Sequence, residues 1–252
     1  MSYQQIKGKY SIMKIINRIS RIFAIVIVYI MCAYTYLSAK GFIFDKGVPV
    51  LSNNAVAKEV FAKELSGDLM IGDNILRAKG SKTAPITMYV FSSMVCSHCS
   101  DFHKRIYPKI EENFISTGDL RFIFVHFPTD MNSMQAAKLS YCLPPNRYYD
   151  FIEELYKRKD WIFDKSIDKI NKHALKFDFK EADIKTCKDN KKLTSDILLA
   201  RDNAISKLGI TGTPSFVVEF KGKKELITGT HSYKEFEQYF NDKLGKNKSD
   251  IR

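Results

Sequence analysis

The sequence predicts an α/β fold in which a helical insert separates a strand–helix–strand unit from a strand–strand–helix unit. Three observations support this prediction. Two apolar strands flank a helical pattern at residues 84–128, strand signals are missing from residues 130–208, and two strand-like runs precede a closing helix at residues 215–244. With 252 residues, 45% of them hydrophobic, the chain can bury a substantial core.

The N-terminus, residues 1–39, has the layout of a secretory signal peptide or a membrane anchor. It contains five basic residues and no acidic one, and an apolar stretch from Ile22 to Leu37 follows the basic run. Ser38 and Ala39 end this stretch with small residues, which favours cleavage near Ala39. Because the stretch is short for a spanning helix but long for a signal core, an uncleaved anchor in the inner membrane is the alternative. In either case we expect the rest of the chain to be exported to the periplasm.

Residues 40–83 form an N-terminal extension that is harder to interpret. Ala55 to Leu65 has the pattern of a short amphipathic helix, which we expect to cap the following domain. A spacer or an oligomerisation element is the alternative. Leu69 to Leu76 is a candidate edge strand.

The main domain predicted for the chain, residues 84–244, begins with a βαβ unit of parallel strands. Its first strand is Ile86 to Phe91, and a helix starts at Cys96 with a core-facing apolar stripe. Pro108 should kink this helix, and Gly118 should end it. The second strand, Leu120 to Phe127, is strongly apolar, so we expect it in the interior of the sheet.

The helical insert, residues 130–208, and the elements after it complete the predicted fold. Five helical stretches are expected in the insert: Met131–Leu143, Tyr148–Arg158, Ser166–Phe177, Glu181–Asp189 and Leu193–Leu208. A hairpin then joins a strand at Ser215–Phe220 to a second at Glu225–Thr230, with a turn at residues 221–223. Ser232 should cap a closing helix, Tyr233–Leu244, and a polar tail, residues 245–252, should fray.

Cys96 and Cys99 mark the candidate reactive site. Their spacing is close to one helical turn, so their Cα atoms should lie near enough for a disulfide. Cys96 falls at a helix N-terminus, where free backbone N–H groups and the macrodipole favour a thiolate, and His98 can add a partial positive charge. A stabilised thiolate is a good leaving group, so the disulfide form should oxidise other thiols. Half of a zinc site with His103, or a purely structural disulfide, are the alternatives.

The remaining cysteines and the net charge indicate in which compartment the protein works and which partners it has. Without Cys32, which lies in the apolar N-terminal stretch, four cysteines remain, and an even number fits an oxidising compartment. Cys142 and Cys187 would then most simply pair with each other, with two buried free thiols as the alternative. The net charge is +12, but the lysines are scattered among acidic residues, which predicts a solvated surface and no nucleic-acid partner.

From about Gly80 to Leu244 the chain resembles the DsbA-type thiol:disulfide oxidoreductases, which have a thioredoxin fold with a helical insert. The Cys96-Ser97-His98-Cys99 sequence is similar to the family's CxHC centre. Other matching pieces, in order along the chain, are Ala84-Pro85-Ile86-Thr87, Phe102-His103, Pro108-Lys109, Gly118 with Arg121-Phe122, and Gly212-Thr213-Pro214-Ser215-Phe216. This ordered set is much more specific than the two cysteines alone.

The resemblance implies a role for each matching residue. Cys96 would be the exposed thiol that forms the mixed disulfide with a substrate, Cys99 its buried partner, and His98 a stabiliser of the Cys96 thiolate. Pro214 would follow a cis peptide bond, and the backbone of Thr213 would pair with an extended substrate segment. The trans form is the default for X–Pro bonds, so an ordinary turn proline is the alternative.

Pairing of insert cysteines occurs in some members of the family, which supports a structural Cys142–Cys187 disulfide. Two departures from the family stand out. Ser97 replaces the proline of the best-known oxidants, so their redox potential cannot be transferred to this chain. Val90 replaces a buried acid found in many members, which puts a carboxylate proton shuttle from this strand in doubt.

These observations predict an exported protein-disulfide oxidase that needs no soluble cofactor and no metal. Its substrates would be unfolded or reduced exported proteins, and by family analogy a membrane-bound partner would reoxidise it. A disulfide isomerase or reductase of the same fold is the first alternative. A metal-binding or chaperone module, built on the two cysteines and a histidine, is the alternative from a different class.

Overall fold

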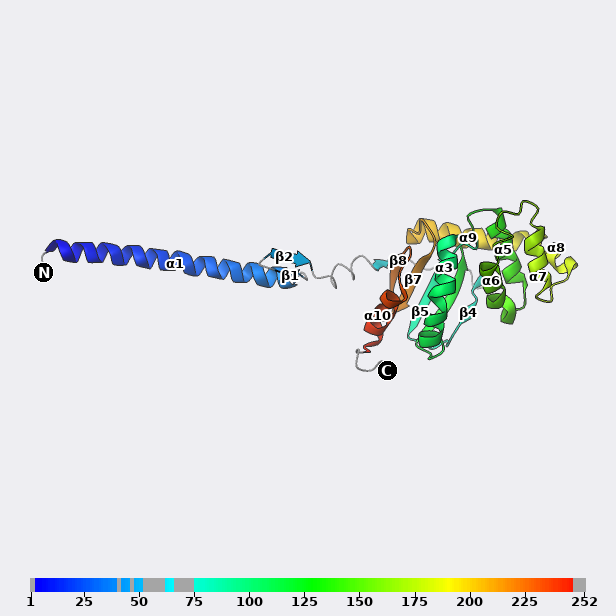
Figure 1. Cartoon of the computed structure of the whole chain (residues 1–252), viewed down its shortest axis with the longest axis horizontal. Coiled ribbons are helices and arrows are strands. Elements are labelled where there is room, and N and C mark those ends of the chain that lie inside the picture. Colours follow the sequence, from blue (N-terminus) through cyan, green and yellow to red (C-terminus); the bar gives the residue numbers. More distant parts are fainter. Residues whose placement is uncertain (1–2, 40–41, 46–47, 52–61, 66–74, 247–252) are drawn as a thin grey trace. The chain divides into compact units, whose positions relative to one another are not determined.

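The computed structural model describes residues 3–39, 42–45, 48–51, 62–65 and 75–246 of the chain (Figure 1). The chain divides into two compact units, residues 1–61 and 62–252, which are described separately.

The first unit contains a single long helix and a small hairpin. Helix α1 runs from Tyr3 to Ala39 and so includes both the basic run and the apolar stretch. Its segment Ser20–Leu37 has a mean hydropathy of 1.7 and none of its residues is buried. By length and composition it could cross a membrane, and a signal sequence would have the same properties. Strands β1 (Phe42–Asp45) and β2 (Val48–Leu51) form an antiparallel pair.

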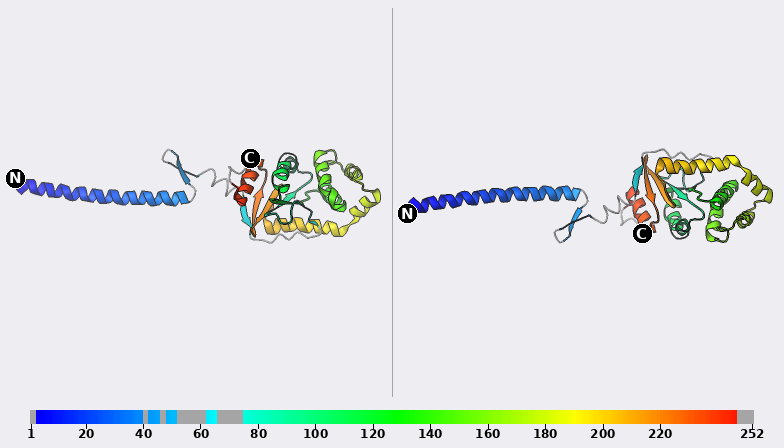
Figure 2. Two further views of the ribbon diagram at one scale, coloured as in Figure 1. Left: turned by 90° about the horizontal axis from the view of Figure 1, so that it is seen from below. Right: turned by 90° about the horizontal axis from the view of Figure 1, so that it is seen from above.

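The second unit is built on a six-stranded mixed sheet with the order β3-β8-β7-β5-β6-β4. Only β5 and β6 are parallel, and every other neighbouring pair is antiparallel. Figure 2 shows α9 along one face of this sheet, with α3 and α10 on the opposite face. The strands are β3 (Lys63–Leu65), β4 (Ala78–Lys79), β5 (Ile86–Ser92), β6 (Leu120–His126), β7 (Ser215–Phe220) and β8 (Lys223–Thr228). The fold is the predicted thioredoxin fold.

The helical connection of the βαβ unit is interrupted at Ile106, as the proline predicts. Helix α3 (Ser97–Arg105) is followed by α4 (Tyr107–Ile110) and by a π-helical turn, Glu111–Ile115. Pro108 has no N–H to donate to the carbonyl one turn earlier, so the regular hydrogen-bond pattern of the helix is broken at this point. Gly118, with φ 84°, ends the connection in a conformation that side chains rarely tolerate.

The insert consists of helices, as predicted. Asp130 and Asn190 cap two of them by accepting hydrogen bonds from Ser133 N–H and Leu193 N–H. The helices are α5 (Met131–Cys142), a 3₁₀ turn (Pro145–Arg147), α6 (Tyr148–Lys157), α7 (Asp168–Leu175), α8 (Glu181–Asp189) and α9 (Lys191–Leu208).

The C-terminal hairpin and helix also follow the prediction, except that the second strand of the hairpin begins earlier than expected. Phe220 pairs with Lys223, so Lys223 belongs to β8 and only Lys221 and Gly222 form the turn, both with positive φ. Helix α10 (Tyr233–Leu244) begins with a capping box between Ser232 and Glu235.

The predicted extension supplies the two outer strands of the sheet. The prediction of a helix from Ala55 to Leu65 was wrong at its C-terminal end, because Lys63–Leu65 is strand β3 paired with β8. Its remaining part, 55–61, lies outside the described residues. The predicted strand Leu69–Leu76 lies mostly outside them as well, and its last two residues are not in a strand; β4 follows instead at Ala78–Lys79.

Candidate active site

Cys96 lies at the junction between the central strand and the helix that follows it. Strand β5 is buried at its end, and the chain turns through Ser93, whose carbonyl accepts a hydrogen bond from Cys96 N–H at 3.1 Å. Cys96 has extended backbone angles and is the N-cap residue of α3. Its side chain is partly exposed and is a free thiol, as is that of Cys99. The strand therefore fixes the position of a reactive thiol at a helix N-terminus.

Several hydrogen bonds lower the pKa of Cys96 to about 5, from an ordinary value near 9. The largest contribution is the side-chain hydrogen bond from Cys99, and partial burial opposes it. The Thr213 side chain and the backbone N–H groups of Cys99 and His98 lower the pKa further. The N–H groups are those left free at the start of a helix, as the sequence predicts. The His98 side chain is exposed, and its role stays a prediction.

Cys99 has the opposite environment. It lies on the inner side of the first turn of α3 and is fully buried. Burial raises the pKa of Cys99 far above the ordinary value, and its side-chain hydrogen bond with Cys96 acts in the same direction. A side-chain hydrogen bond with Ser92, the last residue of β5, partly opposes this increase. The pair is therefore asymmetric, with an anionic outer sulfur and a protonated inner one at neutral pH.

The loop before β7 faces Cys96. The Thr213–Pro214 peptide bond is cis, and Cys96 Sγ lies 3.5 Å from the Thr213 carbonyl oxygen, to which the thiol can donate. Ser215 Oγ donates to the Gly212 carbonyl at 2.8 Å and closes the loop on itself. Gly229 N–H donates to the Pro214 carbonyl and ties the loop to the end of β8. The fold thus brings together the two motifs that the sequence separates by 117 residues.

An apolar groove of about 210 Å³ lies beside Cys96 and was not predicted from the sequence. It runs between the turn after β5 and the insert. The residues that line it are Met94, Val95, Cys96, Ser97, Ser100, Leu155, Tyr156, Lys159, Ile162 and Phe163. Phe163 is 89% exposed, whereas Met94 at the base is buried. The sequence pattern identifies strands and helices, but it does not show that a loop far along the chain lies beside Cys96.

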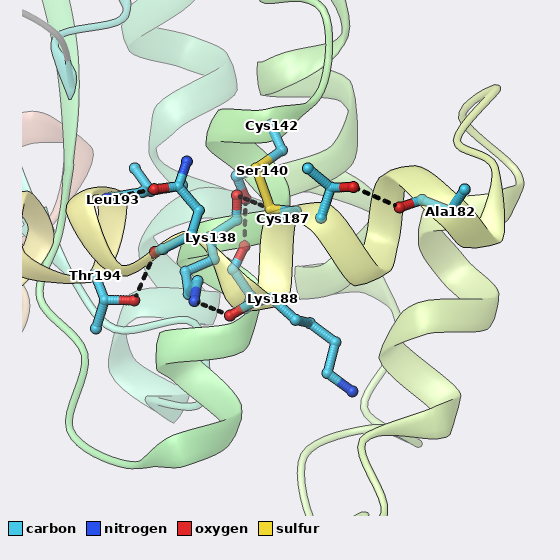
Figure 3. Close-up of a disulfide and its surroundings, with 11 residues drawn as sticks. Lys138, Ser140, Cys142, Ala182, Cys187, Lys188, Leu193 and Thr194 are labelled. Carbon is cyan, nitrogen blue, oxygen red and sulfur yellow. Dashed lines mark hydrogen bonds between the residues drawn. A yellow bond between two sulfur atoms is a disulfide. The ribbon is translucent and has the colours of Figure 1, made fainter.

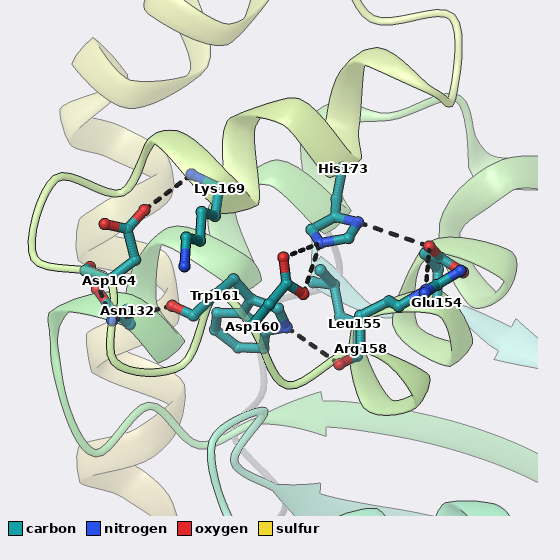
Figure 4. A network of polar contacts seen from close by, with 9 residues as sticks. All are labelled: Asn132, Glu154, Leu155, Arg158, Asp160, Trp161, Asp164, Lys169 and His173. Atoms are coloured by element: carbon teal, nitrogen blue, oxygen red, sulfur yellow. Dashed lines mark hydrogen bonds and ion pairs between the residues drawn. The ribbon is translucent and has the colours of Figure 1, made fainter.

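The loop that supplies the groove's outer wall, residues 158–167, is bound by the side-chain amide of Asn132 on α5 (Figure 4). Asn132 Nδ2 donates to the Ile162 carbonyl at 2.6 Å, with the carbonyls of Trp161 and Asp164 at 3.4 and 3.2 Å. The buried Trp161 also donates its Nε1–H to the Leu155 carbonyl. The Asn132 amide thus satisfies backbone carbonyls of the loop, and Trp161 ties the loop to the last turn of α6.

A charged cluster fastens the same loop to α7. The His173 ring lies between the Asp160 carboxylate, at 3.1 Å from Nε2, and the Glu154 carboxylate, at 3.5 Å from Nδ1 (Figure 4). The hydrogen bond from His173 counters desolvation and lowers the pKa of Asp160. Asp164 accepts a hydrogen bond from Lys169 N–H.

Cys142 and Cys187 form a disulfide between the C-terminal ends of α5 and α8 (Figure 3). The Cα atoms are 6.1 Å apart, within the usual range for such a bond. Beside it, the buried Lys138 donates to the Lys188 carbonyl at the end of α8. The structure therefore separates the four cysteines into two pairs in different elements.

His103, the histidine considered as a zinc ligand, is part of the aromatic core. Its ring is stacked on Tyr156, with centroids 4.6 Å apart, and burial lowers the pKa of His103 to about 3. Tyr107 and Phe124 also pack against it.

Comparisons with known proteins agree with this geometry. The family model described as Thioredoxin matches residues 76–242. Disulfide bond formation protein D of Bacillus subtilis is 26% identical over 152 residues, which cover 56% of this chain and 67% of the relative. The crystal structure of alpha-DsbA1 from Wolbachia pipientis is 30% identical, with a TM-score of 0.64 over 71% of this chain and 95% of that one. That of BdbD from Bacillus subtilis, 24% identical, has a TM-score of 0.59 over 73% and 99% of the two chains.

Proposed function

The chain belongs to the thioredoxin family and within it is a DsbA-like thiol:disulfide oxidoreductase, and from this premise we propose that it is an exported oxidase that introduces disulfide bonds into secreted proteins. The observation that carries this proposal is the asymmetry of Cys96 and Cys99. A low pKa of Cys96 stabilises the reduced pair, so the disulfide form is a stronger oxidant. An isomerase must be kept reduced and would use the same asymmetry, so the experiment below separates the two functions.

In the proposed reaction, Cys96 is the sulfur that a substrate thiolate attacks. Cys99 leaves as the inner sulfur of the pair, and a second substrate thiolate then releases Cys96. Substrate disulfide formation therefore needs two exchanges and no soluble cofactor. The low pKa makes Cys96 the better leaving group in the second exchange.

Substrate binding would combine backbone pairing at Thr213 with apolar contacts in the groove. The partial exposure of Thr213 beside Cys96 supports the first contribution. The exposed Phe163 and the apolar base at Met94 support the second, because unfolded chains present apolar side chains. Lys159 is the one basic residue among those that line the groove, so the contacts there would be mainly apolar and would suit many substrates.

Export would depend on α1. Its apolar segment Ser20–Leu37 follows a run with basic residues and no acidic one, the arrangement of an uncleaved anchor or a cleaved signal. The second unit would then lie in the periplasm, where a membrane-bound partner would reoxidise Cys96 and Cys99.

The decisive experiment is the equilibrium of the full-length protein in detergent micelles with defined ratios of reduced and oxidised glutathione. Alkylation followed by mass measurement reports the oxidation state of the Cys96–Cys99 pair. A potential well above that of thioredoxin, together with oxidation of a reduced unfolded substrate, is the expected result. A thioredoxin-like potential would contradict the oxidase and favour a reductase. Faster repair of a scrambled substrate than oxidation of a reduced one would favour an isomerase.

A further inference from the structure

Cys99 poses a problem of proton transfer. In each cycle its sulfur alternates between a disulfide and a protonated thiol, although the side chain is fully buried. Strand β5 offers no carboxylate next to it, since Val90 is apolar and fully buried as well. A proton must therefore reach Cys99 through other groups that face the pair.

The buried histidines nearby do not provide a hydrogen-bonded route. His103 lies one turn beyond Cys99 on α3, and in the part of the chain that the structure describes neither of its ring nitrogens has a hydrogen-bond partner. His126 is opposite Ser92 in the parallel register of β5 and β6. Burial lowers the pKa of both imidazoles to about 3, so both are neutral at physiological pH.

Two hydroxyl groups do form a continuous route. The Ser92 side chain is close enough to Cys99 to lower the pKa of that thiol, and its Oγ lies 2.8 Å from the Tyr156 hydroxyl. The Tyr156 hydroxyl is also 3.2 Å from the Ser93 carbonyl, so two contacts fix its position. Tyr156 belongs to α6 and lines the groove beside Cys96. The route therefore leads from the buried sulfur to the wall of the groove.

We propose that Ser92 and Tyr156 form the proton path of Cys99, with Ser92 in contact with the sulfur and Tyr156 linking Ser92 to water in the groove. This inference rests on the oxidoreductase activity of the Cys96–Cys99 pair. It assigns proton transfer to Ser92 and Tyr156, neither of which is part of a recognisable sequence motif.

The proton and electron balance of the step is simple. A substrate thiolate attacks Cys96 Sγ, the Cys96–Cys99 bond breaks, and its electron pair stays on Cys99 Sγ. Ser92 gives its hydroxyl proton to this sulfur, Tyr156 returns one to Ser92, and groove water returns one to Tyr156. In reoxidation the proton moves along the same groups in reverse. Burial raises the pKa of Tyr156 well above its ordinary value, so the phenol keeps its proton between transfers.

The test compares the variants Ser92→Ala and Tyr156→Phe with Tyr148→Phe in the full-length protein. Tyr148 is a matched control, because it is fully buried in the same helix and its hydroxyl donates to the Phe124 carbonyl, not to a residue of the site. The readout is the single-turnover rate of mixed-disulfide formation between oxidised protein and a reduced cysteine peptide, from pH 4 to pH 9, in water and in deuterium oxide.

We expect both path variants to react at least about tenfold more slowly than the control at neutral pH and to lose the solvent isotope effect. The pKa of Cys96 should stay near 5 in Tyr156→Phe, which excludes a general loss of the site. Ser92→Thr keeps the hydroxyl and should recover most of the rate, which keeps the test valid if Ser92→Ala folds poorly.

Rates, pH profiles and isotope effects in Tyr156→Phe that match those of Tyr148→Phe would overturn the path while leaving the oxidase function intact. Absence of exchange in the unmodified protein would overturn the oxidase function and the path together.

Discussion

The two cysteine pairs of this chain occupy opposite ends of helices. Cys96 is the N-cap of α3, whereas Cys142 is the last residue of α5 and Cys187 lies in the last turn of α8. The helix macrodipole stabilises a thiolate at an N-terminus and destabilises one near a C-terminus. A disulfide is labile when one of its sulfurs leaves easily as a thiolate. It is durable when neither sulfur does.

Burial alone does not make this distinction. Cys99 and Cys187 are both buried, at 0% and 3% exposure, yet Cys99 lies next to a thiol with a lowered pKa at a helix N-terminus, whereas Cys187 is bonded to a residue at a helix C-terminus. The pairs also differ in span, since one closes a single helical turn and the other a separation of 45 residues. Cys96 and Cys142 are both partly exposed, so the comparison assigns reactivity to helix position and durability to the length of chain enclosed.

The largest expected effect separates the pairs by activity. Cys96→Ser should reduce the oxidation of an unfolded substrate to the rate in glutathione buffer alone, because no outer sulfur remains to be attacked. The double variant Cys142→Ser/Cys187→Ser should keep its activity within about twofold at a temperature where it is folded. A loss of activity in the double variant as deep as that in Cys96→Ser would end the division into a reactive and a structural pair.

The second expected effect separates them by stability. The chain-entropy model assigns a closed loop of this length a contribution of about 4 kcal/mol to the free energy of unfolding. Relative to the oxidised protein, Cys142→Ser/Cys187→Ser should therefore lower the urea midpoint strongly, whereas Cys96→Ser/Cys99→Ser removes a disulfide that closes a single helical turn and should lower it much less. Urea unfolding followed by circular dichroism measures both. Equal midpoints for the two double variants would contradict the proposed structural role.

The third expected effect sharpens the origin of the Cys96 reactivity. In the reduced protein, alkylation of Cys96 should rise as the pH passes through about 5 and level off by neutral pH, because the thiolate is the reacting form. Cys99→Ala removes the largest contribution and should raise this midpoint by about one pH unit or more. An unchanged midpoint would show that the helix N-terminus acts without the inner thiol.

The smallest expected effect concerns His98. Replacement by alanine retains the backbone N–H that lowers the pKa of Cys96 and removes only an exposed imidazole. His98→Ala should therefore raise the alkylation midpoint by less than Cys99→Ala does. A larger increase would identify the imidazole charge as the main cause of the reactivity.

Much of the fold can be predicted from local sequence patterns. The remaining parts are determined by contacts with residues far along the chain. The strand Ile86 to Phe91, the break near Pro108 and the capped helix at Ser232 each carry their signal in adjacent residues. In contrast, Lys63–Leu65 has helical periodicity but pairs with β8, because an open sheet edge outweighs weak local propensity.

The site shows the same division. The spacing of Cys96 and Cys99 predicts a reactive pair. The resemblance of the motif around Pro214 to the DsbA-type proteins predicts the loop that faces this pair. Nothing near Ser92 indicates that a tyrosine 64 positions later will reach its hydroxyl. The role of the Asn132 amide in binding the groove wall is equally impossible to predict from the sequence, because its acceptors are backbone carbonyls about 30 positions away.

The brevity of the outer strands bears on self-association. Strand edges carry unpaired backbone groups that recruit other extended chains, and long apolar edges are sites of aggregation. Here β3 is three residues long, Lys63–Leu65, and β4 is two, Ala78–Lys79, and each includes a lysine. A protein whose proposed clients are unfolded polypeptides meets such chains constantly. Short charged strand edges would let it engage them at the proposed binding residue, Thr213, without offering its own sheet as a template for their polymerisation.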